Sequence, residues 1–254
     1  MKARGEAPLW VRGSVLLAAV FAAAIGPANG AGLFGQPVGE WASRGDEVLR
    51  IAGYAFIIWA PLYLGVVAYG LRQLSAPADE SLSGRMRLGA TVAFLALGLW
   101  VLAAAYDVRW GTVALIIVAL AALLAPLWRH APAVVAALGP DRWLVVWPLA
   151  ALAGWLTAAT PVNLITTAAA EGLLQPPQTA LAVIALLSVA VVGVLVTARL
   201  RTLAYPLPIA WGLFGAFIAE QARDSVVGYA ALGAAITLLV VAGFLVLRRR
   251  KPLS

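Results

Sequence analysis

The chain has 254 residues, of which 63% are hydrophobic and only 11% are charged. Soluble domains are about half apolar and about a quarter charged, so this composition excludes a water-soluble globular protein. The absence of cysteine excludes disulfide bonds, iron–sulfur clusters and thiolate metal sites. The formal net charge is +7.

Apolar segments long enough to cross a membrane recur along the whole sequence. A hydrocarbon layer of about 30 Å is crossed by a helix of about 20 residues, and helices satisfy their own backbone hydrogen bonds in lipid. We therefore predict an all-α integral membrane protein, an eight-helix transmembrane bundle. The expected spans are residues 11–28, 51–71, 88–105, 112–127, 143–169, 179–198, 207–222 and 226–247.

The first segment admits two interpretations. A basic start, a short apolar run over residues 14–25 and the small residues that follow are also typical of a cleavable signal peptide. No clean A-x-A cleavage site follows the run, so we favour a retained span. After cleavage, seven spans would remain, with the new N-terminus outside.

The outer connection over residues 29–50 is long for a link between two helices. It contains five glycines, Pro37 and Trp41. We predict that it forms a lid over a site, and a flexible surface loop is the alternative.

Aromatic side chains gather on one face of the second span. Phe56, Trp59 and Tyr63 share a helix face. At a rise of about 1.5 Å per residue, Trp59, Trp100 of the third span and Trp155 of the fifth span all reach levels near the bilayer centre. Tryptophan in membrane proteins is enriched at the membrane surface, so these three require another explanation.

The fifth span contains the stretch GWLTAATPVN. Trp155, Ala159, Asn163 and Thr167 recur every four residues and share one face. Ala159 leaves a notch between the indole and the amide, and Pro161 removes a backbone donor. Two such faces would wall an aromatic cleft with few polar groups. The alternative is plain helix packing, in which Asn and Thr bond across helices and small residues allow close approach.

The basic residues test the number of spans through the positive-inside rule. With both termini cytoplasmic, 14 of the 18 basic residues fall inside and only Arg44, Arg50, Arg109 and Arg223 fall outside. The bias holds at every inner connection, so we predict cytoplasmic N- and C-termini. The positive charge thus reflects topology, and we expect no nucleic-acid partner.

The spans hold little of the chemistry that catalysis or ion transport needs. No Asp, Glu, Lys or Arg lies near the middle of a span. The charges at the outer ends, such as Glu220 and Arg223, could pair with one another, and we expect most of them to be solvated instead. The only histidine is His130, in an inner connection, so a catalytic triad or haem ligation is not expected. We predict no enzymatic activity, no cofactor and no metal site.

At two stretches the sequence resembles the TspO/MBR family, the tryptophan-rich sensory proteins related to the mitochondrial translocator protein. The family pattern W-x-[ST]-x-A-T-x-x-N is matched by Trp155, Thr157, Ala159, Thr160 and Asn163. The family's second-helix run is similar to Gly53, Tyr54, Phe56, Trp59 and Tyr63. The second stretch looks especially like a longer bacterial branch.

The resemblance implies a five-helix TspO-like bundle over residues 1–170, covered by the loop 29–50, with three additional helices and a basic tail over residues 171–254. It implies the bacterial inner membrane and a pocket for a flat hydrophobic molecule such as a porphyrin. The expected partners are the lipid bilayer, this ligand and, in addition, a second copy in a homodimer. The candidate ligand-binding residues are Phe56, Trp59, Tyr63, Trp100, Trp155, Ala159, Thr160 and Asn163.

This sequence departs from the family at several positions. Leu97 and Gly98 precede Trp100 where the family has an asparagine, and no Tyr or Arg closely follows Asn163, so sterol binding is not expected. Two other functions stay open. Pro61, Pro161 and Pro208 suggest the broken helices of a secondary transporter, and aromatic residues that only seal helix contacts would fit a structural subunit.

Overall fold

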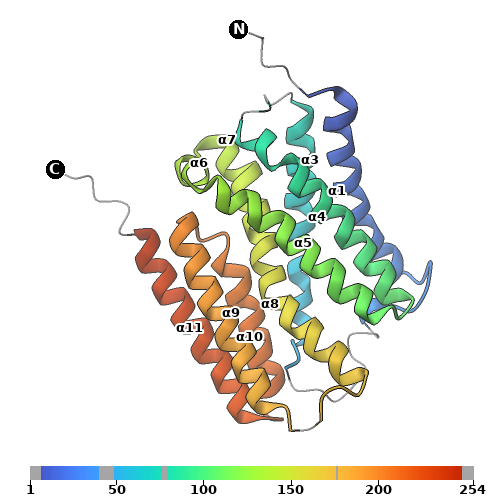
Figure 1. The fold of residues 1–254 in the computed structure, drawn as a ribbon, viewed down its shortest axis with the longest axis vertical. Coiled ribbons are helices and arrows are strands. Elements are labelled where there is room, and N and C mark those ends of the chain that lie inside the picture. The colour runs from blue at the N-terminus through green and yellow to red at the C-terminus, as the bar shows by residue number, and fades with distance from the viewer. Residues whose placement is uncertain (1–6, 40–48, 76–78, 80, 176, 248–254) are drawn as a thin grey trace, which may run out of the picture. The chain divides into compact units, whose positions relative to one another are not determined.

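The computed structural model describes residues 7–39, 49–75, 79, 81–175 and 177–247 (Figure 1). These residues form helices joined by turns, and no strand occurs among them. The predicted all-α architecture is confirmed. The elements are α1 (Leu9–Gly30), η1 (Gly53–Ile58), α3 (Trp59–Leu74), α4 (Leu82–Ala105), α5 (Arg109–Arg129), α6 (Ala131–Ala136), α7 (Gly139–Asp141), η2 (Arg142–Val146), α8 (Trp147–Ala170), α9 (Thr179–Leu200), α10 (Pro206–Glu220) and α11 (Ser225–Leu247).

An apolar helix lies at each of the eight predicted spans. Seven helical segments in the described part of the chain are long and apolar enough to cross a membrane. The remaining one, α10, has 15 residues and is about 22 Å long at the α-helical rise. The chain is therefore a multi-pass membrane protein, while the orientation of its termini stays a prediction.

Two helix starts differ from the predicted spans. α4 begins at Leu82 rather than at residue 88, because the Ser81 hydroxyl accepts a hydrogen bond from the backbone N–H of Gly84 at 3.1 Å. The fifth span begins with the short π-helical turn η2, and α8 then continues through Pro161 without a break.

The other prolines of interest also lie within or at the start of helices. Pro61 lies in the first turn of α3 and Pro208 in the first turn of α10, where a missing N–H costs little. The described helices thus show no break at the three prolines on which the transporter interpretation depended.

The helices form two compact units, and each is described by itself. Unit 1 spans Met1–Arg44 and Trp59–Ala150, and unit 2 spans Gly45–Ile58 and Ala151–Ser254. The division of the chain at residue 170 into a TspO-like bundle and an extension stays a prediction.

In unit 1, α1 packs against both α3 and α4, and α4 packs against α5. The contact of α4 with α5 depends on Gly89, since a Cβ atom there would lie 2.2 Å from the carbonyl oxygen of Ala122. α1 buries Val15, Ala19 and Ala22, and so it is an integral part of the unit.

A cluster of buried polar side chains joins the C-terminal end of α3 to the start of α4 in unit 1. The Gln73 amide donates to the hydroxyl and carbonyl oxygens of Ser83 and accepts a bond from Arg87 Nε at 2.9 Å. Tyr69 Oη donates to the same Ser83 carbonyl at 3.0 Å, and Arg87 Nη1 pairs with Asp79. The paired groups compensate for burial of polar atoms.

The loop after α1 is folded back on the same unit by Asn29. Its buried amide donates to the carbonyl oxygens of Phe34 and Gln36 and accepts a bond from the N–H of Val38. Gln36 in turn bonds to the last carbonyl groups of α4. The start of the predicted lid is therefore an ordered loop, and its residues 40–48 lie outside the described part of the chain.

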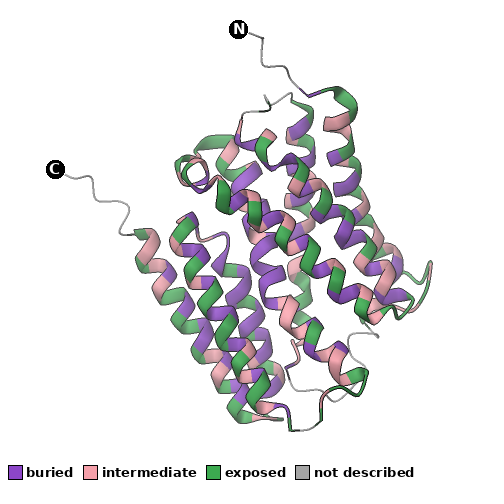
Figure 2. Ribbon diagram, in the orientation of Figure 1, coloured by how far each residue is buried: buried purple, intermediate pink, exposed green. Residues whose placement is uncertain are grey.

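In unit 2, α10 packs against α9, α11 and η1, and α11 also packs against α9. These helices lie side by side in Figure 1. The stretch of α8 that belongs to this unit begins with the continuously buried residues 152–158, drawn in purple in Figure 2. The buried core of unit 2 thus includes part of the TspO-like motif.

Candidate functional site

Two of the predicted ligand-binding residues meet in unit 2. The rings of Phe56 in η1 and Trp155 in α8 lie edge to face, with centroids 6.2 Å apart and planes at 83°. Trp155 is only 1% exposed, whereas Phe56 is 40% exposed. A ligand that approaches this pair would therefore reach Phe56 first, and Trp155 would become accessible only if a neighbour moved.

The indole of Trp155 is held by close packing against α10. A Cβ atom at Gly212 would lie 3.4 Å from the edge of the Trp155 ring and 3.2 Å from Ala158. One turn further along α8, Ala159 and Thr160 are half-buried, and Asn163 is buried. The Thr160 hydroxyl donates its proton to the Leu156 carbonyl of its own helix at 2.7 Å, so it can offer a ligand only its oxygen as acceptor.

The other predicted aromatic residues belong to unit 1. Trp59 and Tyr63, one turn apart at the start of α3, are stacked with centroids 5.0 Å apart and planes at 22°. Both are half-buried, as is Trp100 in α4. The predicted shared face of Phe56, Trp59 and Tyr63 is confirmed for Trp59 and Tyr63, whereas Phe56 lies in the 3-10 helix η1 and belongs to unit 2.

A second aromatic set in unit 2 was not identified from the sequence. Trp211 of α10 donates its indole N–H to the Ala55 carbonyl at 2.8 Å and lies edge to face with Tyr54, with centroids 5.7 Å apart. These contacts attach η1 to α10. Because they join residues more than 150 positions apart, neither periodicity nor a motif indicated them.

Tyr205 was likewise missed. It is fully buried, and its hydroxyl lies 2.7 Å from Thr157 Oγ1. The single Thr157 hydroxyl proton is already donated to the Ala153 carbonyl at 2.8 Å, so Tyr205 is the donor of this pair. Thr157 of the TspO-like motif thus joins α8 to the segment that precedes α10.

The C-terminal end of α10 carries a buried carboxylate. Glu220 Oε1 accepts a hydrogen bond from the backbone N–H of Arg50 at 2.6 Å and lies 3.3 Å from Arg223 Nη1. Its side chain is 1% exposed. The expectation of solvated outer charges does not hold for Glu220, whose Oε1 is paired with a backbone donor and a guanidinium, and these bonds offset part of the cost of burial.

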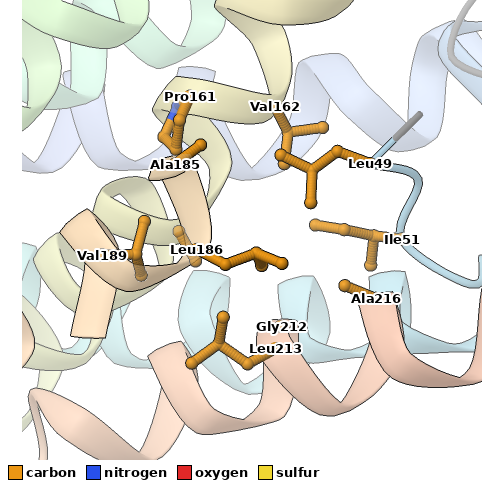
Figure 3. Close-up of a pocket in the computed structure, with 11 residues that line it drawn as sticks. Leu49, Ile51, Pro161, Val162, Ala185, Leu186, Val189, Gly212, Leu213 and Ala216 are labelled. Carbon is orange, nitrogen blue, oxygen red and sulfur yellow. The ribbon is translucent and has the colours of Figure 1, made fainter. Parts of the chain in front are cut away.

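A small cavity lies within unit 2. Its walls come from α8, α9 and α10 and from the segment before η1 (Figure 3). Its volume is about 10 Å³, which is about the room of one water molecule. Its lining residues are Leu49, Ile51, Ala158, Pro161, Val162, Ala185, Leu186, Val189, Gly212, Leu213 and Ala216. None of them belongs to the eight predicted ligand-binding residues.

The titratable side chains do not assemble into a metal site within the described ranges, where no group of three His, Asp or Glu residues lies together. The candidate ligand-binding residues offer a ligand aromatic stacking, apolar packing and a few neutral hydrogen bonds.

Comparison with known proteins gives one match. A family described as TSPO-like protein matches residues 10–244. No curated protein and no solved structure matches the chain. The matched region includes α9, α10 and most of α11 in addition to the stretches that carry the TspO-like motifs.

Proposed function

Because this chain belongs to the TSPO-like protein family, we propose that it is a membrane sensor or translocator that binds a flat hydrophobic small molecule. A metal-free tetrapyrrole is the ligand class that we test first. The proposal includes no enzymatic step, since aromatic and amide side chains bind a planar molecule without acid or base chemistry.

The observation that carries the proposal is the presence of two preformed aromatic pairs at the residues of the family motifs. Phe56 and Trp155 make an edge-to-face pair in unit 2, and Trp59 and Tyr63 make a stacked pair in unit 1. Phe56, Trp59 and Tyr63 are partly exposed and already fixed by a neighbouring ring, so they can stack on a planar ligand at small entropic cost. Each such contact contributes about 0.5–1.5 kcal/mol beyond the buried area.

The remaining predicted residues have narrower proposed roles. Asn163 would orient the ligand, because an amide both donates and accepts hydrogen bonds. Thr160 would act toward the ligand only as a hydrogen-bond acceptor, because its hydroxyl proton is donated to the Leu156 carbonyl. Ala159 and Trp100 would supply apolar surface.

Titration of protoporphyrin IX against the purified protein in nanodiscs tests the proposal, with tryptophan quenching and the porphyrin absorption band as readouts. Phe56→Ala should weaken binding about 2- to 13-fold, the equivalent of one aromatic contact. Phe214→Ala is a matched control, because Phe214 belongs to the same unit and is 41% exposed. No binding by the wild type, or equal loss of affinity in both variants, would reject this site.

A further inference from the structure

The cavity of unit 2 is closed on one side by an extended segment rather than by a helix. We name residues 49–52 the strap. Leu49 and Ile51 of the strap enter the cavity opposite Leu186 and Val189 of α9 (Figure 3). All eleven residues around the cavity are apolar, and those on the helix walls include the small residues Ala185 and Gly212. The helices therefore form an apolar groove that two aliphatic side chains of the strap fill.

Backbone hydrogen bonds attach the strap to α10. Its backbone makes two hydrogen bonds to α10, from Arg50 N–H to Glu220 Oε1 at 2.6 Å and from Ala52 N–H to the Gly215 carbonyl at 3.1 Å. Leu49 has a φ angle of 84°, which is unfavourable for a bulky residue with a Cβ atom. The strap is thus held in a strained conformation, and one of the bonds that hold it ends on the buried Glu220.

Filling of the groove by the strap is incomplete. The residual cavity is about 10 Å³ and has only apolar side chains around it, so a water molecule there would lack the two to four polar partners that it needs. Dry space next to flexible aliphatic side chains suits the methylene groups of a hydrocarbon chain.

The α9 wall of the groove adjoins surface that faces lipid. Ala185, Leu186 and Val189 line the cavity, while Ile184 and Leu187, which flank the first two, are exposed and apolar. Apolar exposed residues on a membrane span face acyl chains, so hydrocarbon chains lie against the same helix that forms the groove.

We propose that the groove between α8, α9 and α10 is a second binding site, that its ligand is an unbranched hydrocarbon chain, and that the strap occupies it until the ligand displaces Leu49 and Ile51. Glu220 retains the strap through its bond to Arg50 N–H. The site shares no residue with the aromatic site proposed above, so either proposal can fail without the other.

Photolabelling of the full-length protein in nanodiscs tests this site. One sample contains phosphatidylcholine with a diazirine on its acyl chain, and a second contains a diazirine-bearing fatty acid. Mass spectrometry then gives the ratio of adducts on the cavity-lining residues Ala185, Leu186 and Val189 to adducts on the exposed Val240 of α11. Labelling of the groove by either probe supports the hydrocarbon-chain site, and the probe that labels it identifies the source of the chain.

Two variants release the strap by different routes. Glu220→Ala removes the acceptor of the Arg50 N–H bond, and Leu49→Ala with Ile51→Ala removes the side chains that fill the groove. We expect the adduct ratio to rise about ten-fold in Glu220→Ala, which corresponds to about 1.4 kcal/mol of lost attachment. The double variant should show a rise in the same direction, and it carries the test if Glu220→Ala does not fold.

Two further variants complete the comparison. Ala185→Phe fills the groove and should abolish labelling of the neighbouring residues, whereas Glu171→Ala, at an exposed acidic residue of the same unit, should leave the ratio unchanged. The proposal is overturned if neither strap variant raises the ratio, or if Ala185→Phe leaves it at the wild-type value.

Discussion

At Gly154, α8 packs closely against the backbone of Tyr205. A Cβ atom there would lie 2.1 Å from the carbonyl oxygen of Tyr205 and 3.0 Å from its carbonyl carbon. Since close carbon–oxygen contacts in proteins are about 3.3–3.6 Å, Gly154→Ala must separate the two backbones by about 1.2 Å. Neither neighbour is a flexible side chain, so the shift must move the main chain.

Two effects of Gly154→Ala lower the free energy of unfolding, and one effect raises it. Overpacking costs about 1–3 kcal/mol. Separation also breaks the 2.7 Å bond between Tyr205 and Thr157, and a buried hydroxyl without a partner costs about 1–3 kcal/mol. Alanine recovers about 0.5–1 kcal/mol of helix propensity. We therefore expect a net loss of about 3 kcal/mol for Gly154→Ala.

Equilibrium unfolding in mixed micelles with rising SDS, followed by circular dichroism, measures this difference. Gly233→Ala in α11 is the matched control: a Cβ atom there meets nothing within 4 Å, so the variant should gain about 0.5–1 kcal/mol. In a Tyr205→Phe background, Gly154→Ala should cost about 2 kcal/mol less, because the hydrogen bond is already absent. Equal stability of Gly154→Ala and the control would refute the close approach of α8 to Tyr205.

Three other substitutions each remove the hydrogen bonds of one side chain, and the expected outcome follows from that loss. Gln73→Leu leaves Arg87 Nε without its buried acceptor and should cost about 2–3 kcal/mol, measured by the same unfolding assay; an unchanged midpoint would contradict the buried network. Asn29→Ala removes three hydrogen bonds to the loop after α1, so amide exchange in that loop should speed up at least about ten-fold by mass spectrometry, whereas an unchanged rate would show that the loop is held by other contacts. The hydrogen bond from Thr179 keeps the pKa of Asp224 below its ordinary value of 3.8, so Asp224 stabilises the folded state above pH 3.8 and this stabilisation is lost as the pH falls through the folded pKa; Thr179→Val should raise the pKa in an NMR titration, and an unchanged pKa would refute the role of the hydroxyl.

The sequence was sufficient to predict the residues of the two family motifs but not their surroundings. Residues at a spacing of four on one helix share a face wherever the helix lies, which is why the Trp59–Tyr63 pair was predictable. The partner of Trp155 was not: its contact with Phe56 joins residues about a hundred positions apart. The proximity of Gly212 to Trp155 also depends on how α8 and α10 meet.

By itself, the sequence determined the class of the protein, the number of apolar helices and the family, because each of these depends on local composition and spacing. Hydrocarbon requires long apolar segments with internal backbone hydrogen bonds, and this requirement can be read one segment at a time. Only the tertiary structure decided that Glu220 is buried against the Arg50 N–H and that Leu49 and Ile51 fill a groove in unit 2. A carboxylate at a helix end is solvated or buried according to what packs over it, and the segment that covers Glu220 lies 170 residues away in the chain.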